Sequence, residues 1–203
     1  MNIDATLTLG DIGRDNLTID AGFICPVITT PSATQNVCIG ASGSNITVNT
    51  DASKIKFVKF TTAQAGTAMY TGGTALVTVT PSSGVATYTW NSADFPNATF
   101  APITYYVYAI LDVVAGASCQ PFQEIQVTVN PLPSFTLAQT NVTCNGAANG
   151  KITTTTISGT TPFTYSKDDG ATFPNTDGIF DNLTPATYKI AVKDANGCVK
   201  KCN

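Results

Sequence analysis

The chain has 203 residues, more than one small β domain needs and enough for two. Apolar residues make up 43% of it, which supports packed cores, whereas charged residues make up only 11% and leave a surface rich in Thr, Ser, Asn and Gly. A net charge of −3 without a basic stripe argues against nucleic acid and anionic membranes as partners, and the lack of histidine removes the commonest general base and metal ligand.

The start of the chain bears on export. Residues Met1 to Gly10 alternate in polarity and lack the basic stretch and apolar run of a signal peptide. No apolar run reaches the length that a membrane span needs, so membrane insertion is not expected. If the protein is exported, we expect its signal to lie outside this sequence, which would make the chain a piece of something longer.

The cysteines indicate an oxidising compartment. None of them forms a CxxC pair, and without histidines a zinc site would need four thiolates from scattered positions, so disulfides are the better interpretation. The alternative is buried thiols in a cytosolic protein, against which the Thr-rich, Lys-poor composition argues. The six cysteines are Cys25, Cys38, Cys119, Cys144, Cys198 and Cys202.

Residues 1–24 predict a single hairpin. Ala5 to Leu9 alternate as A-T-L-T-L, Gly10 to Asp15 supply a turn, and Asn16 to Phe23 form the second strand. Two strands cannot bury a core alone, so we interpret the segment as the C-terminal hairpin of a truncated upstream β domain.

Residues 25–130 predict one β-sandwich. About seven short strands, separated by Gly-, Pro- and Ser-rich turns, are what a sandwich requires. We expect the longest strand, which contains Tyr105 to Ile110, to be buried on both faces. The side chains that point to either face of the sheet are apolar or aromatic in this strand. The expected strands are Val27–Thr30, Asn45–Asn49, Ile55–Thr61, Ala75–Thr80, Val85–Trp90, Thr104–Val114 and Ile125–Asn130.

A short linker and a second module follow. Two prolines, at positions 131 and 133, stiffen the chain and lack the backbone N–H groups that pairing in a sheet needs. Residues 131–133 are therefore predicted to set the angle between the modules. Residues 134–203 carry five Asn-Gly or Asp-Gly dipeptides, which favour hairpin turns. The expected strands are Phe135–Gln139, Lys151–Ile157, Phe163–Lys167 and Thr187–Asp194, with weaker segments near Phe173 and Phe180. No helical periodicity exceeds one turn, and the predicted fold class is all-β with tandem sandwich modules.

The spacing of the cysteines suggests one disulfide within each module. Cys38 and Cys119 lie early and late in the first module, and Cys144 and Cys198 bracket the second, so we predict these two pairs. Closing a loop as long as the first would remove about 4 kcal/mol of unfolded-state entropy in the simple chain model. Cys25–Cys38 is the main alternative pair. The partners of Cys25 and Cys202 are left open.

Acidic residues of the second module are weak candidates for calcium ligands. Hard oxygen ligands on a loop could hold Ca²⁺, but their spacing fits no EF-hand, and Asp before Gly is also the ordinary chemistry of a tight turn. Turn formation is the favoured interpretation, and no other cofactor is expected. The candidates are Asp168, Asp169, Asp177 and Asp181.

No catalytic constellation is evident, and we predict that the chain is not an enzyme. Gly40 to Gly43 does not match a nucleophile elbow, and no histidine could serve as its base. Glu124 is the only glutamate and lies in a predicted strand. Trp90 and the tyrosines at positions 105, 106 and 108 could form a sugar-binding platform, but aromatic residues of this kind more often form sandwich core.

The second module resembles the repeat of the SprB-type gliding-motility adhesins of the Bacteroidota over residues ~134–198. The matching stretches include V-T-C-N-G at 142–146, N-G-K-I at 149–152, P-F-T-Y-S at 162–166, L-T-P-A-T-Y at 183–188 and D-A-N-G-C at 194–198. Ala186, where the family usually has Gly, and the additional Cys202 depart from the pattern.

Two weaker resemblances precede this repeat. Residues 25–130, with their V-T-V-N-P-L-P exit at 127–133, look like the Ig-like or PKD-like modules that accompany such repeats, which implies tandem Ig-like sandwiches. Residues Asn16 to Phe23 are similar to the end of an SdrD B-like repeat, whose usual calcium ligands would lie upstream.

These resemblances imply a very long surface protein of Bacteroidota, exported by type IX secretion and used in gliding motility. The leading hypothesis is therefore a non-catalytic stalk or adhesive repeat of a secreted cell-surface adhesin, with filament formation as a further hypothesis. Its expected partners are neighbouring β modules of the same or adjacent chains, and surface glycans or the substratum. The alternative hypotheses are accessory modules or a carbohydrate-binding module of a secreted multidomain enzyme.

Overall fold

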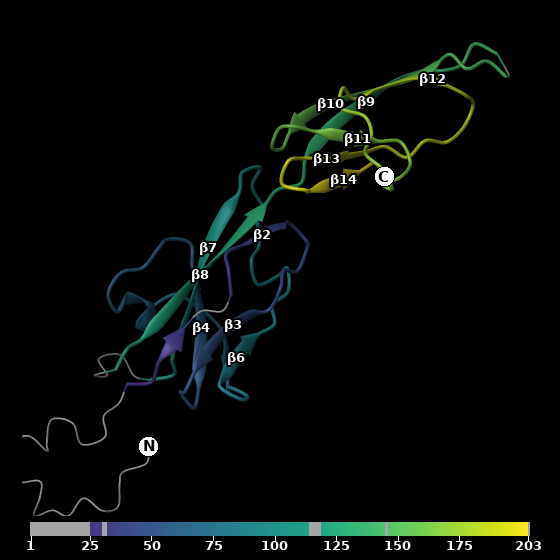
Figure 1. Cartoon of the computed structure of the whole chain (residues 1–203). Coiled ribbons are helices and arrows are strands. Elements are labelled where there is room, and N and C mark those ends of the chain that lie inside the picture. The colour runs from purple at the N-terminus through teal and green to yellow at the C-terminus, as the bar shows by residue number, and fades with distance from the viewer. Residues whose placement is uncertain (1–24, 30–31, 114–118, 145, 203) are drawn as a thin grey trace, which may run out of the picture.

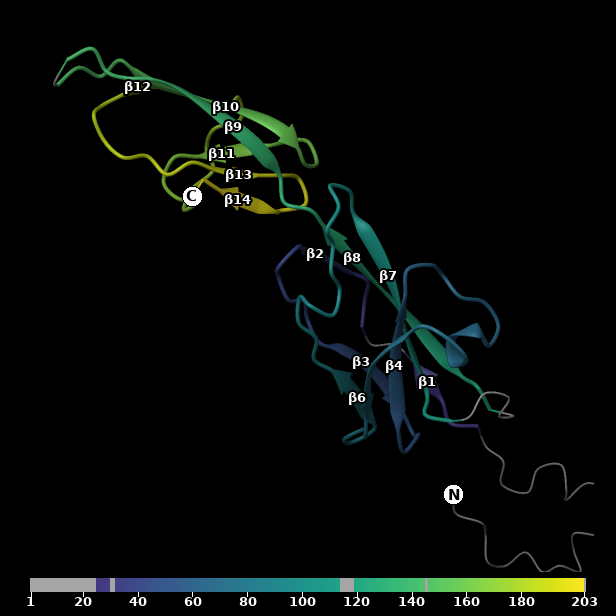
Figure 2. The same cartoon turned by 180° about the vertical axis from the view of Figure 1, so that it is seen from behind.

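The computed structural model of the chain describes residues 25–29, 32–113, 119–144 and 146–202. In this described part, two β modules lie end to end along one long axis (Figures 1 and 2). The hairpin expected over residues 1–24 lies outside the described residues. The described part contains one turn of 3-10 helix, η1 (Ala68–Tyr70), and no helix that could cross a membrane.

The first module is a sandwich of two sheets. The smaller sheet has the strand order β1-β3-β6, and the larger sheet has the order β2-β8-β7-β4-β5. β2 runs parallel to β8, whereas the other pairs are antiparallel. The strands are β1 (Ile28–Thr29), β2 (Gln35–Cys38), β3 (Ile46–Thr50), β4 (Ile55–Phe60), β5 (Thr74–Val79), β6 (Val85–Tyr88), β7 (Ile103–Leu111) and β8 (Phe122–Asn130).

This strand order is that of an immunoglobulin sandwich. β3 and β6 occupy the places of strands B and E in one sheet, and β4, β7 and β8 occupy those of C, F and G in the other. The strands form because their apolar residues alternate, as in β3, where Ile46 and Val48 are buried and Asn49 is exposed. Phe57, Val107 and Val127 meet these residues from the larger sheet and are fully buried.

A tyrosine fixes the corner between the two sheets. The Tyr105 hydroxyl, near the start of β7, donates a hydrogen bond back to the Pro96 carbonyl in the segment that follows β6. A tyrosine at this place, two residues before the position of the second cysteine in antibody domains, is the tyrosine corner of the immunoglobulin fold. Val107 occupies the cysteine position and is fully buried, so packing replaces the usual intersheet disulfide.

The central strand β7 is buried on both faces, as predicted. Its inner face belongs to the main core, whereas Tyr108 and Ile110 on the outer face pack with Val58 and with Met69 of η1. The segment between β4 and β5 therefore covers the outside of the larger sheet. The Tyr108 hydroxyl donates to Glu124 Oε2 at 2.6 Å, and burial together with this carboxylate raises the pKa of Tyr108 to about 12.

The second module is a sandwich of two three-stranded sheets, ordered β12-β10-β9 and β11-β13-β14. Tyr165, Phe180, Leu183, Ile190 and Val192 form its small core, to which both sheets contribute. The predicted fold class, all-β with tandem Ig-like β-sandwich modules, is confirmed. The strands are β9 (Ser134–Thr140), β10 (Gly150–Ser158), β11 (Thr164–Ser166), β12 (Ile179–Leu183), β13 (Ala191–Lys193) and β14 (Val199–Lys201).

Two strands were not predicted from the sequence. β2 is short and has no clean alternation, and it becomes a strand because it pairs with β8 from Gln35↔Val127 to Cys38↔Asn130. β14 is a mostly polar segment that pairs with β13. Conversely, the strand expected over Thr187–Asp194 is confined to Ala191–Lys193, and no strand forms near Phe173.

We predict that the Tyr105→Phe substitution destabilises the first module by about 1–3 kcal/mol, because it leaves the Pro96 carbonyl without its donor in a protected corner. Chemical denaturation of the two proteins measures this difference. Tyr106→Phe, on the neighbouring residue of the same strand, is the matched control and should be nearly neutral. Equal stabilities for Tyr105→Phe and the parent protein would contradict the tyrosine corner.

Candidate functional site: the junction between the modules

The linker between the modules is short. β8 ends at Asn130 and β9 begins at Ser134, so three residues separate the last strand of the first module from the first strand of the second (Figure 1). Pro131 and Pro133 are both buried. Gly159 approaches Pro133 so closely that a Cβ on it would lie 3.0 Å from the Pro133 Cβ, and its φ of +128° also favours glycine.

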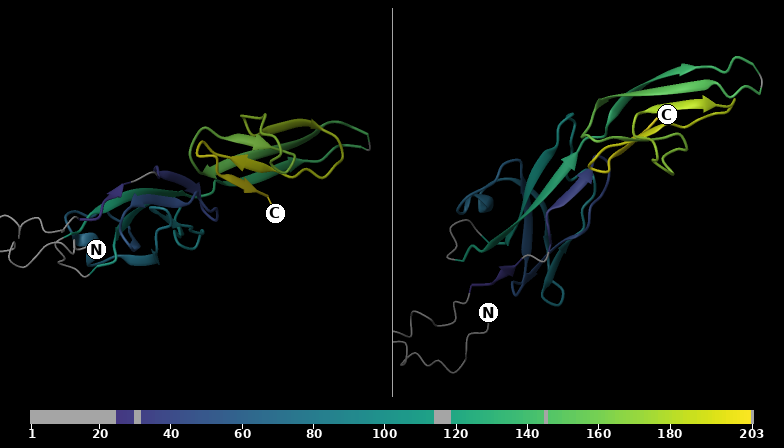
Figure 3. Two further views of the ribbon diagram at one scale, coloured as in Figure 1. Left: turned by 60° about the horizontal axis from the view of Figure 1, so that its bottom comes forward. Right: turned by 45° about the horizontal axis from the view of Figure 1, so that its top comes forward.

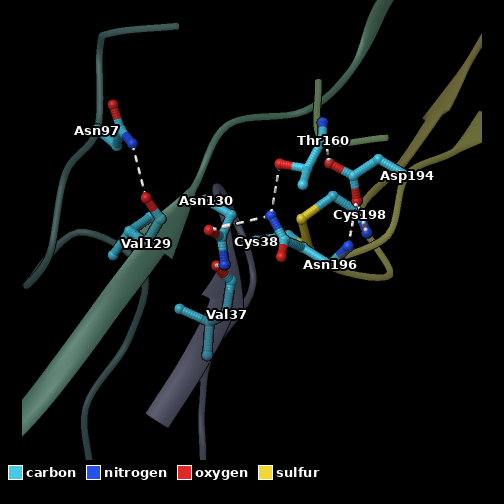
Figure 4. Close-up of a disulfide and its surroundings, with 9 residues drawn as sticks. All are labelled: Val37, Cys38, Asn97, Val129, Asn130, Thr160, Asp194, Asn196 and Cys198. Atoms are coloured by element: carbon cyan, nitrogen blue, oxygen red, sulfur yellow. Dashed lines mark hydrogen bonds between the residues drawn. A yellow bond between two sulfur atoms is a disulfide. The ribbon is translucent and has the colours of Figure 1, made fainter. Parts of the chain in front are cut away.

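A disulfide crosses the junction. Cys38, the last residue of β2 in the first module, is bonded to Cys198, which immediately precedes β14 in the second (Figure 4). The two residues are 160 positions apart in sequence, and Cys198 is fully buried. Closing a loop of this length removes about 5 kcal/mol of unfolded-state entropy in the simple chain model. The bond gives the modules a second covalent connection beside the linker.

Two asparagines add hydrogen bonds beside the disulfide (Figure 4). Asn130 Nδ2 donates to the Val37 carbonyl at 3.3 Å, which holds β8 against β2. Asn196 Nδ2 donates to Asn130 Oδ1 at 3.3 Å across the junction and to Thr160 Oγ1 at 2.9 Å within its own module. Asn130 is buried, so its paired amide is costly to expose and favours one arrangement of the modules.

The D-A-N-G-C motif builds the turn that delivers these groups. Asp194 Oδ1 accepts hydrogen bonds from the backbone N–H of Asn196 at 3.0 Å and of Cys198 at 2.9 Å, and Oδ2 accepts from Thr160 N–H. Gly197 has a φ of +80°, which the turn requires. Asn196 and Cys198 therefore reach the first module from a turn that the buried Asp194 holds in place (Figure 4).

The structure corrects both predicted disulfides. Cys38 is bonded to Cys198 instead of Cys119, and Cys119 is bonded to Cys25. Cys144 is an exposed thiol instead of a partner of Cys198. The prediction was wrong because it assumed that each module closes upon itself, whereas Cys38 and Cys198 lie at facing module ends. The alternative Cys25–Cys38 pair is also wrong, because Cys25 is bonded to Cys119 and Cys38 to Cys198.

The Cys25–Cys119 disulfide belongs to the opposite end of the first module. It joins the segment before β1 to the segment before β8, and its cysteines are 94 positions apart in sequence. Because β1 lies in the smaller sheet and β8 in the larger one, the bond ties the two sheets together away from the junction. Cys202 lies just beyond β14, where its backbone N–H donates to the Ile190 carbonyl at 2.8 Å.

Each of the four candidate calcium ligands has another role. Asp169 pairs with Lys201 at 3.2 Å, and Asp181 pairs with Lys151 at 3.3 Å. The Asp168 carboxylate accepts hydrogen bonds from the Ser166 hydroxyl and from the Thr172 hydroxyl and N–H. These bonds lower the pKa of Asp168, and the bond from Ser166 makes the largest contribution.

The fourth carboxylate, Asp177, caps a turn. The Ile179 N–H donates to it at 2.9 Å and lowers its pKa, with a smaller contribution from Asn175. Within the described ranges, no three His, Cys, Asp or Glu side chains are placed to hold a metal ion. Calcium binding at these loops stays a prediction.

The aromatic residues considered for glycan binding lie mainly in the core. Trp90, Tyr105 and Tyr108 are buried, and Tyr106 is half-buried. Trp90 packs edge-on against Phe95 with ring centroids 4.9 Å apart and donates from Nε1 to the Ser44 carbonyl. This confirms the core interpretation for the three buried rings.

Comparisons with known proteins add one family. The SprB repeat family matches residues 136–172, which cover most of β9 and all of β10 and β11. No curated protein matches the chain. The SprB match and the sandwich fold fit an adhesin-type segment of a cell-surface protein.

The solved structures that match the chain are distant from it in sequence and have low TM-scores. The class 5 fimbriae chaperone CfaA is 12% identical, with a TM-score of 0.33 over 87% of this chain and 99% of that chain. Titin domains I67–I69 are 12% identical, with a TM-score of 0.39 over 87% of this chain and 63% of that chain. The four N-terminal Ig domains of Dscam1 isoform 6.9 are 12% identical, with a TM-score of 0.34 over 88% of this chain and 45% of that chain.

We predict that peptide mapping of the folded, unreduced protein recovers Cys25 linked to Cys119 and Cys38 linked to Cys198. Cys144 should react with a thiol reagent in the native protein because its side chain is exposed. Mass spectrometry after alkylation at low pH, which prevents disulfide exchange, makes both measurements. Recovery of Cys38–Cys119 or Cys144–Cys198 would contradict the junction described above.

Proposed function

We propose that the chain is a non-catalytic stalk segment of a large adhesin on the bacterial cell surface, of the kind used in gliding motility. The observation that carries this proposal is the double covalent connection at the junction. A stalk must hold its adhesive parts away from the cell, and modules that are fixed at an angle give more reach than modules that tumble on a flexible linker.

The junction supports a fixed angle through several contacts that act together. The buried prolines of the linker, the Cys38–Cys198 disulfide and the Asn130–Asn196 hydrogen bond lie within one small region. Two covalent connections remove most of the rotation that one linker would allow. Interfaces between domains are otherwise often mobile, so this arrangement favours a role that depends on shape.

The location and family of the protein are supported by separate features. Two disulfides suit an extracellular compartment, and the SprB match suits a surface adhesin of Bacteroidota exported by type IX secretion. Residues 25–130 are assigned to the Ig-like or PKD-like modules that accompany such repeats. The SdrD B-like resemblance concerns residues 16–23, which lie outside the described residues.

A non-catalytic role is supported by the chemistry of the described side chains. The chain has no histidine, and its one glutamate, Glu124, accepts hydrogen bonds from Tyr108 and Gln126 within the sheet. Asp194 is the one buried charged residue of the described part of the chain, and its carboxylate accepts the hydrogen bonds of the turn at the junction. The partners that this role implies are neighbouring β modules, with glycans or the substratum as adhesive targets.

Replacing Cys38 and Cys198 by Ser should broaden the range of inter-module angles, because a single three-residue linker then carries the connection. Small-angle X-ray scattering of the monomer should show a wider distance distribution than that of the parent protein. The matched control replaces Cys25 and Cys119, which also removes one disulfide but at the far end of the first module. This control should keep the parent's shape, and an equally wide distribution in both variants would argue against a rigid junction.

The size and place of the native polypeptide test the proposed adhesin. An antibody raised against this chain should detect a protease-accessible band of several hundred kilodaltons or more in intact source cells. A band of modest size that copurifies with a hydrolytic activity would instead indicate an accessory region of a secreted enzyme. That second result would overturn the adhesin role and leave the rigid junction intact.

A further inference from the structure

The strand β9 forms an open edge of the second module. In the sheet β12-β10-β9 it pairs only with β10 among the described strands. Residues 136–140 are exposed on both of its faces. The β9–β10 hairpin extends along the long axis of the module, with its tip at the end far from the first module (Figures 1 and 3). Its outer edge is thus accessible over most of the strand.

The backbone of β9 offers a regular row of hydrogen-bonding groups. Its pairing with β10 is continuous from Thr140↔Lys151 to Phe135↔Thr156, and the register shifts only beyond Thr156. In an antiparallel ladder, alternate residues direct both their N–H and C=O away from the partner strand. β9 therefore presents unpaired donors and acceptors at a spacing that another extended strand can match.

Other edges of the described sheets carry features that discourage such pairing. β12 contains Asp181, which pairs with Lys151, and Asn182, whose φ of +56° interrupts the strand. β14 has lysines at positions 200 and 201. The pairing of β5 with β4 contains a bulge within β5, between Ala75 and Val77. The remaining edge strands, β1, β2, β6 and β11, have four residues or fewer. Charges, bulges and short length are the usual protection of sheet edges.

From Phe135 to Thr140, beyond the register shift at Ser134, β9 has none of these protections. No charged residue occurs between Glu124 and Lys151, and no proline occurs after Pro133 in this stretch. The strand is long and reads S-F-T-L-A-Q-T. Because it carries no charge, two copies of it do not repel each other, and antiparallel pairing brings chemically similar residues together.

We propose that β9 pairs antiparallel with β9 of a second copy of this chain, about a two-fold axis at Leu137. Leu137 then faces Leu137 of the second copy, and Thr136 faces Ala138 in both directions. The two three-stranded sheets become one continuous sheet across the interface. The contact is isologous, so it closes as a dimer and leaves no further β9 edge open.

This side-by-side pairing goes beyond the stalk and would join neighbouring chains laterally. One pair of strands makes a small interface, which predicts weak association in isolation. Chains that carry several such repeats would associate far more strongly, because each pair formed raises the effective concentration of the next.

Charge exchange at the edge tests the pairing and its register. One variant carries Thr136→Lys and Ala138→Lys, and the other carries Thr136→Glu and Ala138→Glu. Either variant alone places like charges opposite each other twice and should stay monomeric, whereas an equimolar mixture should restore dimers through opposite charges. Sedimentation velocity at high protein concentration measures this, with Cys144 and Cys202 replaced by Ser in all proteins to prevent disulfide exchange.

The matched control is Thr155→Lys, which adds a charge at an exposed position of β10 directly opposite Thr136. This charge lies one strand further from the interface, where salt screens it, so dimers should form as in the parent. Monomeric parent protein, dimers in the Lys variant alone, or failure of the mixture to dimerise would each overturn the proposal. Species larger than a dimer would show a heterologous contact and would overturn it as well.

A second measurement does not depend on introduced charges. Leu137→Cys in the same Cys144→Ser, Cys202→Ser background should form a disulfide-linked dimer on mild oxidation, because facing residues of antiparallel strands have Cα atoms about 4.5–5.5 Å apart. Thr155→Cys should stay monomeric. Equal cross-linking of the two variants would mean random collision and would contradict the two-fold axis at Leu137.

Discussion

The Cys38–Cys198 disulfide is the interaction on which the arrangement of the whole chain depends. It can form only if β2 lies beside β8 and if the turn after β13 faces the first module. The neighbouring contacts satisfy both conditions, since Asn130 bonds to the carbonyl of Val37 and Asp194 holds the turn that carries Cys198. The disulfide, the buried amide and the linker therefore select the same geometry. Free rotation of the modules is incompatible with the disulfide and would break the Asn130–Asn196 hydrogen bond.

Much of the fold follows from local patterns in the sequence. Alternation of apolar residues located β3, β4, β7 and most other strands, because a half-buried strand needs a side-chain period of two. Asn-Gly and Asp-Gly pairs marked the turns of the second module for the same local reason. β2 and β14 escaped detection because their extended form depends on pairing with β8 and β13, and four or fewer residues carry too little pattern to show it.

The junction could be predicted only in part. The proline linker and the D-A-N-G-C turn were visible in the sequence, but the role of each residue in the turn was not. Cysteine order along the chain does not reveal which cysteines meet, since pairing depends on the relative placement of two modules. Asn130 gave no signal at all, because an asparagine before a proline linker is ordinary until its amide is seen between Val37 and Asn196.

The two disulfides also determine how the chain would carry a pulling force. The shortest covalent route from Cys25 to Cys202 follows residues 25–38, crosses to Cys198 and continues along residues 198–202. Residues 39–197, which form nearly all of both sandwiches, lie outside this route. Tension applied at these two points would be borne by a few residues and one sulfur–sulfur bond, so neither module could unravel to lengthen the tether. In an oxidising environment the segment would behave as an inextensible link, whereas reduction would turn it into two modules that yield in series.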